Sequence, residues 1–212
     1  MTRVVFPAVY PIIDEVVAEA HGWAISDLGT ALFDGGATLV QLRCPRYSLS
    51  RFLACADDLV ERASSYDARV IINDRIDIAT LSGASGVHVG QNDLHVPLAR
   101  RLLTPGAVVG LSTHTTEQLA ESRLLDIDYV AVGPIYETTT KATGYPALGV
   151  GAVQSARAVI ESLPVIAIGG ITLDNALDVL AVGATSVAII SDIFSAGDPT
   201  QRTRAYVERL AV

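Results

Sequence analysis

A chain of 212 residues, half of them apolar, is long enough to bury the core of one domain. Its net charge of −8 excludes a broad basic surface, so we predict no nucleic-acid partner. No apolar stretch approaches the roughly 20 residues that span a bilayer, and Cys44 and Cys55 alone suggest neither a disulfide framework nor a metal cluster. Pro7 and Pro11 interrupt the first apolar run, which argues against a secretory signal. The sequence therefore predicts a cytoplasmic protein without a membrane partner.

Apolar, β-branched runs alternate with amphipathic segments along the whole chain. The runs that predict strands are Ala8–Ile13, Thr38–Leu42, Arg69–Ile72, Gly86–Val89, Val108–Leu111, Tyr129–Val132, Pro164–Ile168 and Ser186–Ile190. The segments between them that predict helices include Leu49–Ser64, Thr116–Leu125, Gln154–Leu163 and Leu173–Val182. In the first of these helices the apolar residues recur at helical spacing, at Phe52, Cys55, Ala56, Leu59, Val60 and Ala63.

Eight strands that alternate with helices indicate parallel pairing with right-handed crossovers. Two architectures meet that requirement: an open doubly wound sheet and a closed barrel. The repeat is short and even, and no Gly-x-Gly-x-x-Gly follows the first strand, which weakens the dinucleotide-binding alternative. We therefore predict an α/β protein of one domain, a (β/α)8 TIM barrel that spans residues 1–212.

Polar residues cluster where the predicted strands end, which is where barrels of this kind place their chemistry. In chain order they are Gln41 and Arg43; Asn73, Asp74 and Arg75; Gln91, Asn92 and Asp93; Ser112, Thr113 and His114; Thr138, Thr140 and Lys141; Gly169-Gly170; and Ser191-Asp192. Any one of them could be a turn residue or a helix cap. The whole set, converging on one rim, predicts a binding or catalytic site.

Asp74 and Asp93 are the candidate metal ligands. Mg²⁺ is typically held by one or two carboxylates, with waters and substrate phosphates completing its octahedron. The alternative is that both carboxylates cap a helix or pair with Arg75 and Arg100. A His/Cys set that would suggest zinc is not visible.

Two features predict phosphate groups in the ligands. Arg43 and Lys141 place positive charge on opposite sides of the rim, where with the metal they could neutralise a diphosphate. Gly169-Gly170 and Ile190-Ser191 follow the seventh and eighth strands, whose loops often hold a phosphate by backbone N–H groups. Among the histidines, His114 is the candidate acid or base. His88 lies within a predicted strand, and we expect it to be a residue of the barrel interior.

In combination and in this order, the motifs resemble the thiamine-phosphate synthase family over nearly the whole chain. The matching stretches are Val40-Gln41-Leu42-Arg43, Ile71-Ile72-Asn73-Asp74-Arg75, Gly86-Val87-His88-Val89-Gly90-Gln91-Asn92-Asp93, Gly110-Leu111-Ser112-Thr113-His114, Tyr129-Val130-Ala131-Val132-Gly133-Pro134-Ile135, Thr138-Thr139-Thr140-Lys141 and Ala167-Ile168-Gly169-Gly170-Ile171. The resemblance implies a transferase that joins hydroxymethylpyrimidine diphosphate to thiazole phosphate and releases pyrophosphate.

The resemblance also implies a role for each matching residue. The pyrimidine diphosphate would be held by Gln41, Arg43, Asn73, Ser112 and Lys141, of which Arg43, Ser112 and Lys141 are the candidate catalytic residues. Asp74 and Asp93 would hold Mg²⁺, the implied cofactor. The thiazole phosphate would be held by Thr138, Thr140, Gly170, Ile190 and Ser191. The implied partners are small phosphorylated molecules, and a homodimer is compatible with the sequence.

One position departs from the family's pattern. The family usually has a Lys two residues after the Arg of Gln-x-Arg, and here Pro45 stands at that position, with Arg46 one residue later. The missing Lys favours an alternative, a thiazole tautomerase of the same superfamily that would use His114 as acid or base. Asp74, Asp93 and Lys141 favour the synthase. A third alternative is a non-catalytic barrel that binds phosphorylated ligands.

Overall fold

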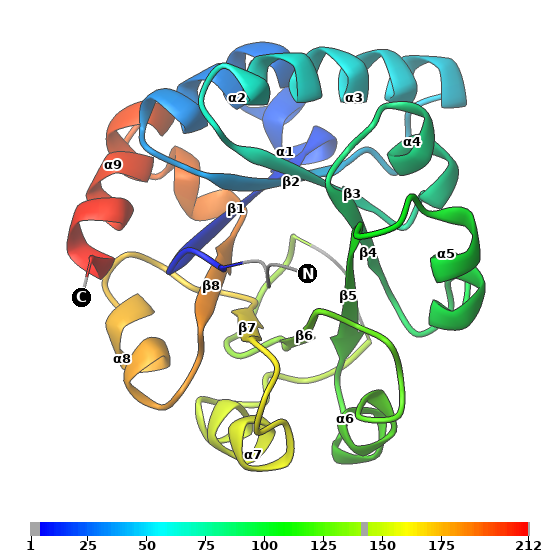
Figure 1. The fold of residues 1–212 in the computed structure, drawn as a ribbon. Helices are drawn as coiled ribbons and strands as arrows, with labels where there is room; N and C mark the ends of the chain where they lie inside the picture. Colours follow the sequence, from blue (N-terminus) through cyan, green and yellow to red (C-terminus); the bar gives the residue numbers. More distant parts are fainter. Residues whose placement is uncertain (1–4, 141–143, 212) are drawn as a thin grey trace.

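The computed structural model describes residues 5–140 and 144–211, which form eight parallel strands closed into a barrel (Figure 1). The strands are β1 (Val9–Asp14), β2 (Leu39–Arg43), β3 (Arg69–Asn73), β4 (Gly86–Val89), β5 (Val108–Thr113), β6 (Tyr129–Val132), β7 (Val165–Ile168) and β8 (Ser186–Ile189). Each strand pairs with the next, and β8 pairs with β1 to close the barrel. The predicted (β/α)8 barrel is confirmed, with every strand within two residues of its expected bounds.

Helices surround the barrel on its outside (Figure 1). They are α1 (Glu15–Ala20), α2 (Ile25–Asp34), α3 (Leu49–Ser64), α4 (Ile76–Leu81), α5 (Val96–Leu102), α6 (Thr116–Ser122), α7 (Gly151–Val159), α8 (Ala176–Ala181), the 3₁₀ helix η1 (Ser191–Phe194) and α9 (Pro199–Leu210). In the described part of the chain, none of these helices has the length and apolar character that crossing a membrane would require.

The helix bounds differ from the expected ones where side chains form turns. α7 ends at Val159 rather than Leu163, because the Arg157 guanidinium donates to the carbonyls of Glu161 and Leu163 and holds the next residues in a turn before β7. α8 begins at Ala176 rather than Leu173, because Asn175 Oδ1 accepts a hydrogen bond from Thr172 N (2.8 Å).

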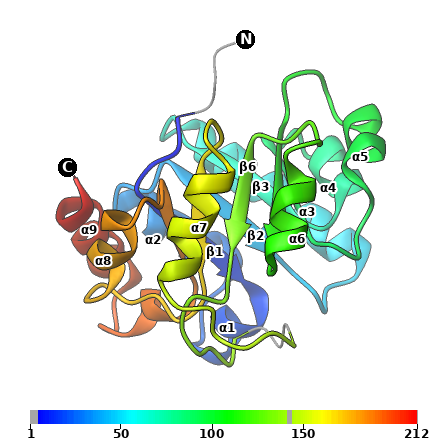
Figure 2. The ribbon, with the colours of Figure 1, turned by 90° about the horizontal axis from the view of Figure 1, so that it is seen from below.

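Alternate residues of each strand point into the barrel, and this alternation positions the site. In β2, Val40 and Leu42 pack outward against the helices, whereas Leu39 packs in the barrel interior. Gln41 and Arg43 have the same parity as Leu39 and reach the interior nearer the carboxyl end of the strand. In β2 the inward positions are thus apolar at the amino end and polar at the carboxyl end. Figure 2 shows α1 and the loop between β6 and α7 together at one end of the barrel.

Candidate active site

A cavity of about 430 Å³ opens at the carboxyl ends of the strands, and all eight strands contribute to its lining. The predicted substrate residues that line it are Gln41, Arg43, Asn73, Ser112, Thr138, Thr140, Gly170, Ile190 and Ser191. Asp74 and Asp93 are not among the described residues that line the cavity. Lys141 lies outside the part of the chain that the structure describes. Residues that are far apart in the sequence are therefore brought to one cavity, as their strand-end positions predict.

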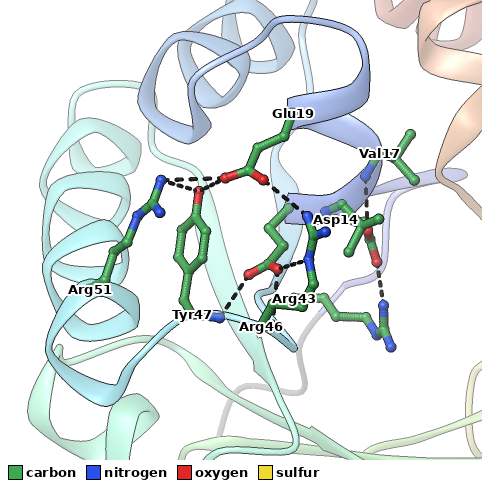
Figure 3. Close-up of polar contacts among 9 residues, drawn as sticks. Asp14, Val17, Glu19, Arg43, Arg46, Tyr47 and Arg51 are labelled. Atoms are coloured by element: carbon green, nitrogen blue, oxygen red, sulfur yellow. Dashed lines mark hydrogen bonds and ion pairs between the residues drawn. The ribbon is translucent and has the colours of Figure 1, made fainter.

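Among the described residues, Arg43 is the Arg or Lys side chain that lines this cavity. An ion pair with Asp14 holds it in place (Figure 3). Asp14 ends β1 and caps α1: its Oδ1 accepts from Val16 N and Val17 N (3.0 and 3.1 Å), while its Oδ2 accepts from Arg43 Nη1. Arg43 Nε is buried and has no hydrogen-bond partner among the described residues. A buried donor without a partner costs free energy, so an anionic ligand oxygen at this position would be stabilised.

The loop between β2 and α3 is tied to α1 rather than to the cavity (Figure 3). The fully buried Glu15 carboxylate accepts from Arg46 N (3.0 Å), Arg46 Nε (2.8 Å) and Tyr47 N (3.1 Å). Glu19 accepts from Arg46 Nη2 (3.0 Å) and from the Tyr47 hydroxyl (2.9 Å), which also accepts from Arg51. Arg46 is thus engaged by two carboxylates of α1, and it is not among the described residues that line the cavity. The Arg46 guanidinium therefore faces α1 and not the cavity.

We expect Arg46→Ala to leave turnover unchanged within about twofold, because its guanidinium faces α1. The variant should unfold at a lower urea concentration, since Glu15 keeps two backbone donors but loses a charged one. Urea unfolding and steady-state kinetics would check both. Arg51→Ala is the matched control, because its exposed ion pair should contribute less than about 1 kcal/mol. Loss of turnover in Arg46→Ala alone would mean that Arg46 binds substrate.

The loops after β7 and β8 meet beside the cavity. Gly169 and Gly170 have φ values of 103° and 63°, a region that residues with a Cβ rarely adopt. A Cβ at Gly170 would also lie 2.6 Å from the Glu137 carbonyl oxygen. Asp192, in η1 after β8, accepts from Leu173 N (3.2 Å) and from Arg202 Nε (3.0 Å). The Asp192 carboxylate therefore joins the two loops and anchors them to α9.

Asp74 and Asp93 lie at neighbouring strand ends, outside the cavity lining. Asp74 has a φ of 62°, and its backbone N–H donates to the His88 carbonyl (2.8 Å), which holds the turn after β3 against β4. Asp93 Oδ2 accepts from Gly90 N (2.7 Å) in the loop after β4. In the described residues, no group of three His, Cys, Asp or Glu side chains is close enough to hold a metal by itself. A donor set of two carboxylates fits Mg²⁺ that also binds substrate phosphates and waters.

The two histidines near the cavity make different contacts. His114 Nδ1 lies 2.6 Å from the Gly133 carbonyl oxygen, and its ring stacks on Tyr145 at 4.4 Å between centroids. A carbonyl oxygen only accepts, so Nδ1 carries the proton and Nε2 of a neutral ring is an acceptor. His88 is a buried interior residue, as predicted, and its two ring nitrogens lie within 2.9 Å of hydroxyl groups of Tyr129 and Ser112.

Among the described residues of the site that were not predicted from the sequence are Asp14, Tyr10 and Tyr129. Asp14 could have been predicted, because it is a carboxylate that directly follows the first predicted strand. Tyr10 and Tyr129 lie inside apolar runs, where a tyrosine is expected to be a core residue. Their hydroxyls become part of the site only through contacts between distant strands.

A closed barrel with a cavity at the carboxyl ends of its strands defines the class of this protein, a (β/α)8-barrel enzyme. The family model described as thiamine monophosphate synthase matches residues 9–193. The chain belongs to this thiamine monophosphate synthase family.

The similarity to known proteins extends over nearly the whole chain. The thiamine-phosphate synthase of Methanospirillum hungatei is 38% identical, over 94% of this chain and 95% of that protein. That of Thermus thermophilus is 39% identical, over 92% of this chain and 95% of that protein. Among solved structures, the thiamine phosphate pyrophosphorylase from Pyrococcus furiosus superposes with a TM-score of 0.85, at 26% identity and with 96% of each chain covered. The 3-hexulose-6-phosphate synthase from Salmonella typhimurium, 19% identical with 96% and 98% of the chains covered, shares the fold (TM-score 0.70).

Proposed function

We propose that this protein is a thiamine-phosphate synthase, which joins hydroxymethylpyrimidine diphosphate to thiazole phosphate and releases pyrophosphate. The observation that carries the proposal is Arg43. Its side chain lines the cavity, Asp14 fixes it, and its buried Nε has no partner in the described residues. A diphosphate oxygen is the kind of group that would complete these contacts.

The proposed chemistry is loss of pyrophosphate from the pyrimidine and capture of the resulting cation by the thiazole nitrogen. That nitrogen has a lone pair, so no general base is required. The residues of the cavity would act by orientation and by neutralising charge. Gln41, Asn73 and Ser112 would hold the pyrimidine diphosphate with Arg43 and with Lys141. Across the cavity, the thiazole phosphate would be held by Thr138, Thr140 and the backbone of Gly170, Ile190 and Ser191.

Mg²⁺ is the proposed cofactor, and Asp74 and Asp93 would hold it. When bound, the ion would supply positive charge next to the leaving pyrophosphate. Two carboxylates at adjacent strand ends, beside a site for a diphosphate, support this assignment. We also propose a cytoplasmic location.

Asp93→Asn should raise the Mg²⁺ concentration needed for half-maximal activity by about tenfold or more, since even residues behind the ligands can cost 10–100-fold in metal affinity. An asparagine oxygen can still accept from Gly90 N, so the fold should be retained. Mg²⁺ titrations of activity would measure the shift, for Asp74→Asn as well. Asp77→Asn, which removes a carboxylate paired with Arg75, serves as control. Unchanged Mg²⁺ dependence in both site variants would contradict the metal assignment.

Gly170→Val should weaken binding of thiazole phosphate by about tenfold to a hundredfold, because a side chain there displaces the backbone that would bind the phosphate. Calorimetric titration measures the affinity directly. Gly22→Val is the matched control. Gly22 has a similar φ of 73°, but no atom of another described residue lies within 4 Å of its Cβ position, so the variant carries the backbone strain alone. The unphosphorylated thiazole alcohol should bind the unaltered protein much more weakly than the phosphate. Equal affinity for both ligands would rule this phosphate site out.

Turnover of the purified protein tests the proposed function directly. With both substrates and Mg²⁺, we expect thiamine phosphate and pyrophosphate in equal amounts. A tautomerase would interconvert thiazole isomers without releasing pyrophosphate, and a binding protein would titrate with the ligands without forming product. Either result would overturn the synthase proposal.

A further inference from the structure

A continuous chain of hydrogen bonds crosses the barrel interior. Gln41 Nε2 donates to the Tyr10 hydroxyl (3.1 Å), which lies 3.3 Å from the Tyr129 hydroxyl. The Tyr129 hydroxyl lies 2.9 Å from His88 Nδ1, and His88 Nε2 lies 2.8 Å from Ser112 Oγ. The five side chains come from β2, β1, β6, β4 and β5, and all of them line the cavity. The first and last, Gln41 and Ser112, are substrate residues in the proposed function.

The direction of these hydrogen bonds is set by the Tyr10 proton. The Tyr10 oxygen accepts from the Gln41 amide, and among the described residues the Tyr129 hydroxyl is the acceptor within reach of the Tyr10 proton, so Tyr10 donates to Tyr129. Tyr129 then accepts from Tyr10, and its own proton goes to His88 Nδ1. A neutral imidazole that accepts at Nδ1 carries its proton at Nε2, and it donates that proton to Ser112 Oγ. The Ser112 hydroxyl proton is therefore directed away from His88.

We propose that Tyr10 and Tyr129 are positioning residues, which hold His88 as its Nε2–H tautomer and thereby turn the Ser112 hydroxyl proton toward the ligand. This inference rests on the proposed function, in which Ser112 contacts the diphosphate substrate. A hydroxyl proton stabilises an anionic oxygen, whereas the opposite direction of the chain would present an oxygen lone pair to it. These hydrogen bonds thus orient the Ser112 hydroxyl as a donor before the substrate binds.

The surroundings of the two tyrosines keep this direction fixed. Both rings are almost completely buried, and the Tyr129 ring packs against Phe6 (4.9 Å between centroids) and His88 (5.4 Å). Burial raises the pKa of both hydroxyls above the ordinary value for tyrosine, so each keeps the proton that it must donate. Gln91 Nε2 donates to the Ser112 carbonyl. This contact fixes the main chain of Ser112, the last residue in the chain of hydrogen bonds.

The tautomer of His88 can be measured without substrate. We expect the long-range ¹H–¹⁵N spectrum of protein labelled at histidine to show His88 protonated at Nε2 and unprotonated at Nδ1, with His88→Gln used for assignment. Tyr129→Phe removes the hydroxyl and keeps the ring, and it should shift His88 toward a mixture of tautomers. Tyr66→Phe, which removes a hydroxyl bonded to Asp34 on the outside of the barrel, should leave the spectrum unchanged. A wild-type His88 protonated at Nδ1, or an unchanged spectrum in Tyr129→Phe, would overturn the inference.

A double-mutant cycle tests whether the tyrosines act through Ser112. Tyr129→Phe should lower kcat/KM for the pyrimidine diphosphate about tenfold in the wild-type background, but less than about twofold in Ser112→Ala. Equal losses in both backgrounds would show a general structural effect and overturn the inference. If Tyr129→Phe does not fold, Tyr10→Phe interrupts the same chain one bond earlier and should give the same pattern. Should the protein turn over no substrate, the proposed function fails, and the histidine spectrum still decides the tautomer.

Discussion

Gly110→Ala is expected to destabilise the barrel by about 3 kcal/mol, at the upper end of the usual cost of overpacking a core. A Cβ at Gly110 would lie 2.0 Å from Cζ of Tyr129, at the hydroxyl-bearing edge of a ring that its neighbours hold in place. Phe6 and Tyr10 pack against that ring inside the barrel, at 4.9 and 6.2 Å between centroids. Urea unfolding followed by circular dichroism would measure the loss.

Gly151→Ala is the control for this measurement. Gly151 begins α7, and no atom of another described residue lies within 4 Å of the position that its Cβ would occupy. Alanine should therefore be neutral there or stabilise by about 0.4–1 kcal/mol, through the entropy of the unfolded chain. If Gly110→Ala were as stable as Gly151→Ala, the Tyr129 ring would not be fixed, and its hydroxyl could not hold His88.

Arg43→Gln is expected to lower turnover by about 10²–10³, the usual effect of removing one fixed donor to developing charge. It should also lower the unfolding free energy by about 3 kcal/mol, because the buried Asp14 carboxylate loses its charged partner. That figure is at the low end for a broken buried pair, since Val16 N and Val17 N still donate to Asp14. Kinetics well below the unfolding midpoint would separate the two effects.

Two further variants make the Arg43 result specific. Asp14→Asn keeps the cap of α1 but removes the charge that holds Arg43, so turnover should fall by less than in Arg43→Gln, with most of the stability retained. Arg62→Gln removes an exposed ion pair with Asp58 on α3 and should change neither quantity measurably. If Arg43→Gln kept wild-type turnover, the observation that carries the proposed function would be lost.

The sequence predicts the barrel well because its strands are unbroken β-branched runs and its helices have one apolar face. Within α3, Phe52, Ala56, Leu59 and Ala63 are buried, whereas Cys55 at the edge of that face is half-buried. Strand-end residues such as Gln41 and Ser112 could be predicted, because the fold alone brings carboxyl ends together. Their alternation with outward residues places them inside the barrel.

Other features of the site depend on which distant residues meet, and a single sequence does not contain that information. The Tyr10 and Tyr129 hydroxyls approach each other across 119 residues of chain. Arg46 could have faced the cavity or the solvent by sequence alone, and its partner Glu15 lies 31 residues earlier. In both cases the residue type was compatible with several roles, and the packing of neighbouring strands and helices determines which one it has.

The Asp192 carboxylate gives α9 a place in the order of assembly of this molecule. Arg202 and Tyr206 of α9 both donate to Asp192 Oδ2, and Leu173 N donates to it from the loop after β7. During synthesis, β7 and β8 leave the ribosome before α9, so the loops that follow them are made before their anchor exists. The pairing of β1 with β8 that closes the barrel does not involve α9, whereas the loops after β7 and β8 share their anchor with it. The loops proposed to bind the thiazole phosphate therefore depend on α9 for their final arrangement.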